Sequence, residues 1–255
     1  MSAAVSRVAV ITGAAQGIGR ETARELDSRG WSLALLDQQQ VDVAGYRDAI
    51  CVVGDISDES VVQSGARQVL NAFGHVDALI NNAGISMIQA ALDTPSETYR
   101  KVLDVNLVAP FMLCKAYGRS MVERGSGSVV NVASVAGLQG VAERSAYNAS
   151  KHGLIGLTRT LAVEWGGRGV RVNAVCPGWV KTEMDHKDQA GGSYSDSDIT
   201  DHVPMGRFAR PQDIAQAIAW LCDPDASGFV NGVTLPVDGG WTSDGSWQNL
   251  RLRQR

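Results

Sequence analysis

The sequence predicts an α/β protein with a doubly wound, mostly parallel sheet of seven strands and helices on both faces. Short β-branched runs alternate with longer helical patterns along all 255 residues. The runs are continuously apolar, which is typical of parallel strands buried on both faces. No linker, repeat or change in composition interrupts this alternation, so we expect a single domain over residues 1–255.

Each predicted strand is a short apolar run, and a helical pattern lies between most pairs of strands. The predicted strands are Val8–Thr12, Ser32–Asp37, Ala49–Val53, Ala78–Asn81, Ser128–Val132, Arg171–Val175 and Thr234–Val237. The predicted helices are Gly17–Arg29, Glu59–Phe73, Glu97–Val122, Tyr147–Trp165 and Pro211–Leu221. Crossovers between parallel strands are right-handed, so the helices are divided between the two faces.

Two segments depart from the alternation. Residues 183–203 are polar and rich in Gly, Ser and Asp, which fits either a disordered surface loop or a lid over a ligand site. Residues 241–255 form a C-terminal tail with a basic end. The tail is either a solvated end or a segment that reaches a neighbouring subunit.

Composition excludes several classes of function. The net charge of −4 gives no general attraction to nucleic acid or to anionic membranes. The four cysteines are scattered, and no pair of Cys or His residues has metal-ligand spacing, so we expect core thiols and no metal. No apolar run reaches the length of a membrane span, and the N-terminus lacks signal-peptide architecture. We expect a cytoplasmic protein.

A glycine-rich turn follows the first predicted strand. Thr12-Gly-Ala-Ala-Gln-Gly-Ile-Gly19 lies between that strand and a helix, as a dinucleotide site requires. The glycines admit a close ligand, and the helix N-terminus favours a phosphate. Alone, such a trio is often just a tight turn.

Asp37 strengthens the nucleotide interpretation. It ends the second strand, eighteen residues after Gly19, where an acid can bond the adenosine ribose 2′-hydroxyl. A 2′-phosphate would be repelled, and Gln38-Gln-Gln40 offers it no cation, so we favour NAD over NADP. Arg20 is a complication because it can reach the ribose region. The alternative is a strand-end Asp that only forms a turn.

Two further strand ends carry polar groups. Asp55 follows the third strand and either accepts from the adenine amine or forms a turn. Asn81-Asn-Ala-Gly84 ends the fourth strand, where it either leaves room for adenosine or is a plain turn. Neither segment decides the function alone.

A phenol and an ammonium lie four residues apart in Tyr147-Asn-Ala-Ser-Lys151. In a helix they share one face, and Ser134, just past the fifth strand, can fold back to meet them. A phenol needs about 4 kcal/mol of help to lose about three pKa units. A unit charge at about 4 Å supplies that only at an effective dielectric near 20, in a sheltered cleft. The pattern indicates proton transfer at an alcohol oxygen, unless the pair is an ordinary helix start.

Taken together, these motifs resemble the short-chain dehydrogenase/reductase family over nearly the whole chain. The matching segments are TGAAQGIG at 12–19, NNAG at 81–84, Asn106, Ser134, YNASK at 147–151 and Pro177-Gly178. The resemblance implies a Rossmann fold and NAD(P)(H)-dependent oxidation of alcohols or reduction of carbonyls. It implies that Ser134, Tyr147 and Lys151 are catalytic, and that Asn106 joins them through a water. Gln16 replaces a basic residue that many NADPH-using relatives carry, and the stretch from Asp37 to Cys51 is short for the family.

The expected site therefore has three parts. The catalytic residues are Asn106, Ser134, Tyr147 and Lys151. The cofactor residues, in part implied by the resemblance, are Gly13, Gln16, Gly17, Ile18, Gly19, Asp37, Asp55, Ile56, Asn82, Ala83, Gly84, Tyr147, Lys151, Pro177, Gly178, Val180 and Thr182. The substrate pocket is expected to be lined by Ser134, Gln139, Val141, Arg144, Trp179 and Met184.

The sequence favours an NAD-dependent dehydrogenase of secondary alcohols, with polyols or sugars suggested by the polar segment 183–203. Two alternatives are a 3-oxoacyl-thioester reductase, which usually draws on NADPH, and a non-catalytic regulator that keeps the fold. The helices 97–122 and 147–165 are apolar on more than one face. Such surfaces need cover, and together with the resemblance they predict a homotetramer, or else a dimer.

Overall fold

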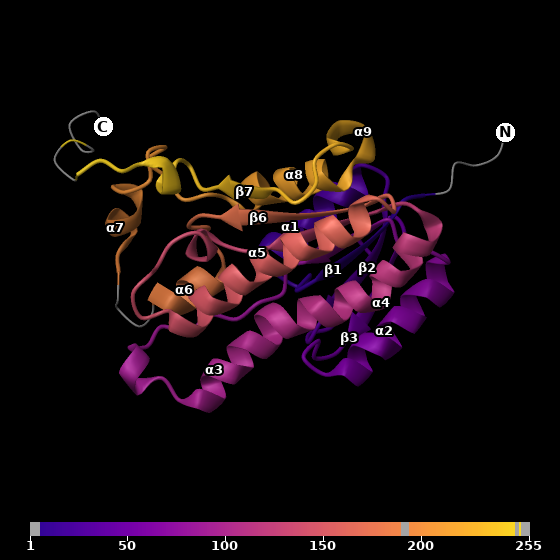
Figure 1. Ribbon diagram of the computed structural model, residues 1–255, viewed down its shortest axis with the longest axis horizontal. Coiled ribbons are helices and arrows are strands. Elements are labelled where there is room, and N and C mark those ends of the chain that lie inside the picture. The colour runs from indigo at the N-terminus through magenta and orange to yellow at the C-terminus, as the bar shows by residue number, and fades with distance from the viewer. Residues whose placement is uncertain (1–5, 190–193, 248–249, 251–255) are drawn as a thin grey trace.

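The computed structural model describes residues 6–189, 194–247 and 250, and its sheet confirms the predicted fold class (Figure 1). Seven strands pair in parallel in the order β3-β2-β1-β4-β5-β6-β7. Their bounds are β1 Val8–Thr12, β2 Ser32–Asp37, β3 Ala49–Val53, β4 Ala78–Asn81, β5 Gly127–Val132, β6 Val170–Pro177 and β7 Thr234–Val237. The order reverses direction between β1 and β4, and ligands of such sheets bind at the carboxyl ends of the strands beside that point.

Helices cover both faces of the sheet, as Figure 1 shows. On one face lie α2 (Glu59–Phe73), α4 (Ala109–Arg124) and α5 (Ser145–Gly166), which pack on alternate strand residues such as Leu79 and Val129. On the other lie α1 (Gly17–Ser28) and α8 (Pro211–Cys222), which pack on Ile80 and Val130. The two apolar layers bury both faces of the strands and hold the carboxyl edge in place.

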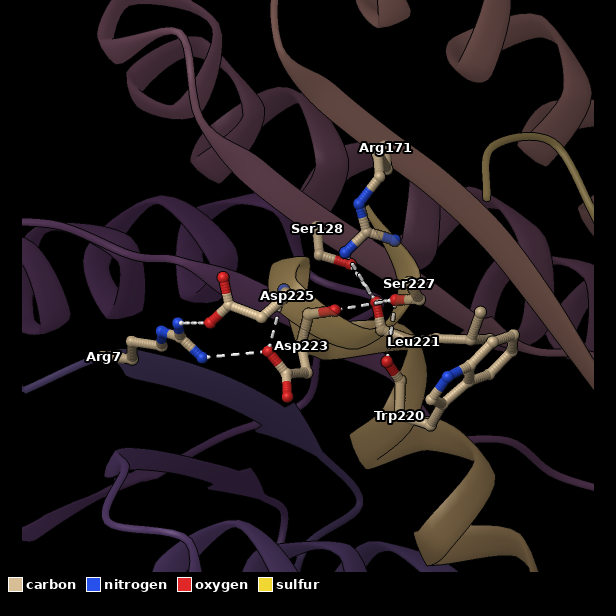
Figure 2. Close-up of polar contacts among 8 residues, drawn as sticks. All are labelled: Arg7, Ser128, Arg171, Trp220, Leu221, Asp223, Asp225 and Ser227. Atoms are coloured by element: carbon tan, nitrogen blue, oxygen red, sulfur yellow. Dashed lines mark hydrogen bonds and ion pairs between the residues drawn. The ribbon is translucent and has the colours of Figure 1, made fainter. Parts of the chain in front are cut away.

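The amino edge of the sheet is closed by polar contacts with the end of α8 (Figure 2). Ser128 and Arg171, near the starts of β5 and β6, both donate to the Leu221 carbonyl, at 2.9 and 2.8 Å. Arg7 precedes β1 and bonds Asp223 at 3.2 Å. Ser128 and Arg171 thereby satisfy a carbonyl that the helix end leaves unpaired, and Arg7 pairs with the carboxylate of the residue that follows α8. The amino edge is therefore structural, and the carboxyl edge carries the loops that build the site.

Two predictions about the elements need correction. The helix expected over Glu97–Val122 is α3 (Ser96–Leu103) and α4, joined by a π-helical turn at Asp104–Val108. The described residues of the segment 183–203 do not form a disordered loop, because they contain the short helices α6 (Glu183–Gln189) and α7 (Asp196–Thr200). Trp241, at the start of the predicted tail, packs on its own chain, and its ring centre lies 5.8 Å from that of Trp179 and 3.8 Å from that of His202. The tail beyond residue 247 lies largely outside the described residues.

The connection between β2 and β3 is short. No helix forms between β2 and β3, as the short stretch from Asp37 to Cys51 predicted. Within the described part of the chain, no helix has the length and apolar character needed to cross a membrane. The same residues contain no cluster of three or more His, Cys, Asp or Glu side chains suited to a metal ion.

Candidate active site

The glycine-rich turn presents an open helix N-terminus at the carboxyl edge of β1. Gln16 precedes α1 and makes no capping hydrogen bond, and the first turn of α1 contains no acidic residue. By contrast, Asp58 caps α2, whose first turn carries Glu59. Among the described residues, neither the N-cap side chain nor a first-turn acid occupies the amide groups and positive dipole end of α1, which suits a pyrophosphate site.

Two of the glycines serve packing as well as access. A Cβ on Gly19 would lie 2.1 Å from the Gly13 carbonyl oxygen, and one on Gly13 would lie 2.9 Å from the Ala83 Cα atom. Asn82 donates to the carbonyl oxygens of Thr12 and Gly13, at 2.9 and 3.1 Å. The NNAG segment therefore braces the glycine turn, and the Asn82 side chain acts on the backbone of that turn.

Asp37 lies beside the glycine turn with its carboxylate fixed. Its two oxygens accept from the backbone amides of Ala15 and Gln39, each at 3.0 Å. Arg20, which the sequence left as a possible phosphate ligand, lies within 4 Å of the Glu21 and Glu183 carboxylates. The ribose end of the site thus carries a positioned acid and a cation that is already engaged by two acids.

The predicted adenine contacts divide into two kinds. Asp55 accepts from the amide and hydroxyl of Ser57, and these hydrogen bonds hold the pKa of its carboxyl below the usual range. The turn role that the sequence left open for Asp55 is therefore filled. The Ile56 side chain is buried in the core with Val52 and Val62, so only its backbone is available to a ligand.

Tyr147, Ser134 and Lys151 come together at the carboxyl ends of β5 and β6. Lys151 is 4% exposed, donates to the Val132 carbonyl at 2.8 Å, and lies 5.5 Å from the centre of the Tyr147 ring. Ser134 is 9% exposed, and its side chain acts on the Tyr147 hydroxyl and lowers the pKa of that phenol. The long segment between β5 and α5 folds back as predicted, and it brings the two hydroxyls together.

The electrostatics of this cluster differ from the sequence-based expectation. Burial raises the pKa of Tyr147, while the Ser134 hydrogen bond and the Arg144 charge lower it. Burial also lowers the pKa of Lys151 to about 8. The sheltered cleft that was expected to strengthen the lysine's pull on the phenol therefore disfavours both charged forms.

Asn106 lies at the centre of the π-helical turn, in an irregularity of a kind that is frequent at functional sites. Its amide exchanges two hydrogen bonds of 2.9 Å with the Ile85 backbone and donates to Ser150 at 3.1 Å. A Cβ on Gly84 would lie 3.2 Å from its Oδ1 and 3.5 Å from the Lys151 Nζ atom. The glycine thus keeps a space open beside both polar groups.

The segment after β6 closes the site from the other side. A Cβ on Gly178 would lie 2.8 Å from the Asp238 Cα atom, so this position must be small. Val180 is buried and bridges to Ala209, while the Thr182 side chain lies 3.4 Å from the Cβ position of Gly17. Thr182 therefore lies beside the glycine turn.

The expected substrate wall contains both predicted and unpredicted residues. Arg144 is 8% exposed, and its guanidinium lies 5.7 Å from the Trp179 ring centre. Gln139 bonds through its backbone to Asn148, Val141 is half-buried, and Met184 is 36% exposed on α6. The sequence missed Ser86, Asp188 and Tyr194, which contact Arg144 or Trp179. Ser86 lies only two residues beyond the NNAG motif, but Asp188 depends on a helix that the polar pattern did not reveal.

Comparison with known proteins agrees with this fold. Residues 13–242 match a family model described as enoyl-(acyl carrier protein) reductase. A D-threitol dehydrogenase from Mycolicibacterium smegmatis is 38% identical over 92% of this chain and 93% of its own. A galactitol 2-dehydrogenase (L-tagatose-forming) from Cereibacter sphaeroides is 39% identical over 92% of this chain and 94% of its own. The chain belongs to the short-chain dehydrogenase/reductase family, whose members bind a nicotinamide cofactor.

A solved structure also superimposes on the chain. A candidate NAD(P)-dependent gluconate 5-dehydrogenase from Beutenbergia cavernae, with NADP bound at low occupancy, is 38% identical with a TM-score of 0.86. The alignment covers 93% of this chain and 97% of that one. With these relatives, the protein is an oxidoreductase of the class that interconverts alcohols and carbonyl compounds.

Proposed function

We propose that the protein is an NAD-dependent dehydrogenase that interconverts a secondary alcohol and its ketone, with Tyr147 as general acid and base. The observation that carries the proposal is the cluster of Ser134, Tyr147 and Lys151 at the carboxyl edge beside an uncapped helix N-terminus. Polyols and sugars are the substrates we favour, because the two relatives above are named for threitol and galactitol.

The nicotinamide cofactor supplies the hydride acceptor when bound. Gly13, Gly17 and Gly19 would admit its pyrophosphate at the start of α1, and Asp37 would accept from the adenosine ribose. Preference for NAD is supported by the fixed Asp37 carboxylate and by the two acids that surround Arg20. A 2′-phosphate at this position would meet like charge without a free cation.

The protein groups divide the proton chemistry among them. Ser134 donates to the substrate oxygen and holds it against the phenol. Tyr147 removes the hydroxyl proton in oxidation and returns it in reduction. Lys151 stabilises the phenolate by its charge, and its hydrogen bond to Val132 fixes where that charge lies. Asn106 would hold the water through which the proton reaches Lys151, in the space that Gly84 leaves open.

A panel of alcohols and ketones, read by NADH absorbance, tests the proposal. We expect secondary alcohols to reduce NAD and the matching ketones to oxidise NADH, with a Tyr147→Phe sample as the control for non-enzymatic change. A 3-oxoacyl thioester is the main competitor, because the matching family model is described by an acyl-carrier-protein substrate. Turnover of that thioester with NADPH alone would replace the proposal by the thioester reductase. Absence of turnover with every member of the panel would favour a non-catalytic regulator.

A further inference from the structure

Three side chains form a closed polar triangle on the substrate side of the site. Arg144 donates from one nitrogen, Nη1, to the Ser86 hydroxyl at 2.6 Å and to the Asp188 carboxylate at 2.9 Å. Ser86 donates to the same Asp188 oxygen at 3.3 Å. The three residues come from the loop after β4, the start of α5 and the end of α6. The triangle therefore joins three separate segments at the carboxyl edge of the sheet.

The charges of this triangle are buried. Arg144 is 8% exposed, and the Asp188 side chain is 15% exposed. A buried ion pair is weak support for stability, because removing two charges from water costs about as much as their attraction returns. The pair also lies close to Tyr147, because Arg144 directly precedes α5, the helix whose first turn carries Tyr147, and bonds Asp188 at 2.9 Å. Consistent with this position, the Arg144 charge lowers the pKa of Tyr147 and the Asp188 charge raises it. Its position at the reacting phenol suggests a role in ligand binding beyond packing.

The triangle retains unused hydrogen-bonding capacity. Arg144 bonds through Nη1 and Asp188 through Oδ2, so the Arg144 Nη2 and Nε atoms and the Asp188 Oδ1 atom make no hydrogen bond to other described residues. A hydroxyl group both donates and accepts, so it suits a guanidinium donor beside a carboxylate acceptor. The charges of the pair cancel, and Asp188 would repel a ligand carboxylate from Arg144.

An aromatic wall lies next to the triangle. The Trp179 ring lies 5.7 Å from the Arg144 guanidinium and 5.0 Å from the Tyr194 ring. Its indole Nε1 is buried with no hydrogen-bond partner among the described residues. An unpaired buried donor costs about 1–3 kcal/mol, which a ligand acceptor would offset. Charged groups beside an aromatic face with a spare donor match a molecule that has C–H faces and several hydroxyls.

We propose that Ser86, Arg144 and Asp188 form a subsite for a hydroxyl group on the carbon next to the reacting carbinol. The substrates are then neutral vicinal diols, as in polyols and sugars, and not isolated secondary alcohols or hydroxy acids. This inference rests on the proposed dehydrogenase function for the reacting position. The carbinol loses a hydride to NAD and a proton to Tyr147, giving a ketone, NADH and a proton, while the neighbouring hydroxyl is bound without reacting.

The test compares two alcohols that differ by one hydroxyl, 2,3-butanediol and 2-butanol. We expect wild-type kcat/KM to be at least tenfold higher for the diol, a difference of about 1.4 kcal/mol. Ser86→Ala and Asp188→Asn should each reduce this preference about tenfold, mainly through KM of the diol, and leave 2-butanol within about twofold. Each variant is assayed at its own optimal pH, because both charges act on the Tyr147 pKa. Asp225→Asn, an exposed carboxylate paired with Arg7 and placed near the end of α8, is the matched control and should change neither value.

The other outcomes distinguish a failure of the proposed subsite from a failure of the proposed dehydrogenase function. Equal losses for both alcohols in Ser86→Ala and Asp188→Asn would show that the triangle only holds α6 in place, and would overturn the proposal. A preference for 3-hydroxybutanoate over the diol would show an anion site and would also overturn it. If no alcohol reduces NAD, the proposed function fails. The subsite is then tested by titrating the protein with D-threitol in the presence of NADH and following tryptophan fluorescence. Saturable binding that both variants lose would uphold the subsite, and no binding would refute it.

Discussion

Lys151 gives a prediction about stability that does not depend on the substrate. It is buried to 4% exposure, and burial lowers its pKa from 10.5 to about 8. At about 1.36 kcal/mol per pKa unit, the charged lysine costs the fold about 3 kcal/mol at pH 7. Lys151→Met removes this cost and also removes the bond to Val132, which is worth about 1 kcal/mol. The variant should be inactive and more stable than wild type by about 2 kcal/mol at pH 7.

The sign of the pH dependence follows from the direction of the shift. Between about pH 8 and 10.5 the unfolded chain binds a proton at Lys151 that the folded protein has released, so wild-type stability gains with rising pH in this window. The free-energy cost of burying the charged lysine is fully present below about pH 8 and is absent above about pH 10.5. By pH 9.5 this free-energy cost falls to about 1.4 kcal/mol, which is close to the value of the lost Val132 hydrogen bond. The free energies of unfolding of Lys151→Met and wild type should therefore be nearly equal at that pH.

Urea unfolding at pH 7 and 9.5, at one protein concentration, measures both differences. Lys101→Met replaces an exposed lysine on α3 and serves as the matched control, with no change expected at either pH. The reasoning is refuted if Lys151→Met is no more stable than wild type at pH 7. It is also refuted if the difference is the same at both pH values.

Three further predictions concern the cofactor, the phenol and the assembly. Because the Asp37 carboxylate is fixed and Arg20 lies near the Glu183 carboxylate, kcat/KM with NAD should exceed kcat/KM with NADP by at least tenfold. Asp37→Ala should reduce this preference for NAD. Equal wild-type kcat/KM values for the two cofactors would contradict the prediction. Ser134 lowers the pKa of Tyr147, so Ser134→Ala should raise that pKa and move the rising limb of the pH profile for alcohol oxidation to higher pH. A rising limb at the wild-type pH would show that Ser134 does not tune Tyr147 during the reaction. A groove of about 350 Å³ between α4 and α5 includes Phe111, which is 49% exposed, and we predict that it packs against another subunit of a homotetramer. Light scattering at micromolar concentration should give the tetramer mass for wild type and a smaller mass for Phe111→Ser, whereas a monomeric wild type would refute the assembly.

The strands and the cluster of Ser134, Tyr147 and Lys151 were predictable because each depends on a local pattern. Continuous apolar runs gave five of the strands with the bounds seen in the structure, and the other two differ by extension at their ends. Tyr147 and Lys151 share one helix, so their spacing alone placed them together. Ser134 required only that a twelve-residue connection fold back over the sheet edge.

The remaining features depend on contacts between distant segments. Pro110 lies inside the run from Glu97 to Val122 and marks an interruption of the predicted helix. The sequence does not show that Asn106, in the π-helical turn before this proline, pairs with the backbone of Ile85. The helix α6 is short and polar, and its Asp188 is tied to Arg144 across the site. The effect of burial on the Tyr147 pKa could not be read from spacing, because it requires knowing how deeply the phenol lies.

The central claim is that the Tyr147 hydroxyl transfers the proton while hydride moves at carbon. The most direct measurement is kcat for the best alcohol in Tyr147→Phe, together with NADH affinity by fluorescence titration. The hydroxyl acts in the transition state, so we predict that kcat falls by at least a hundredfold while NADH affinity stays within about threefold. A variant with near-normal kcat would contradict the account and remove Tyr147 from the mechanism.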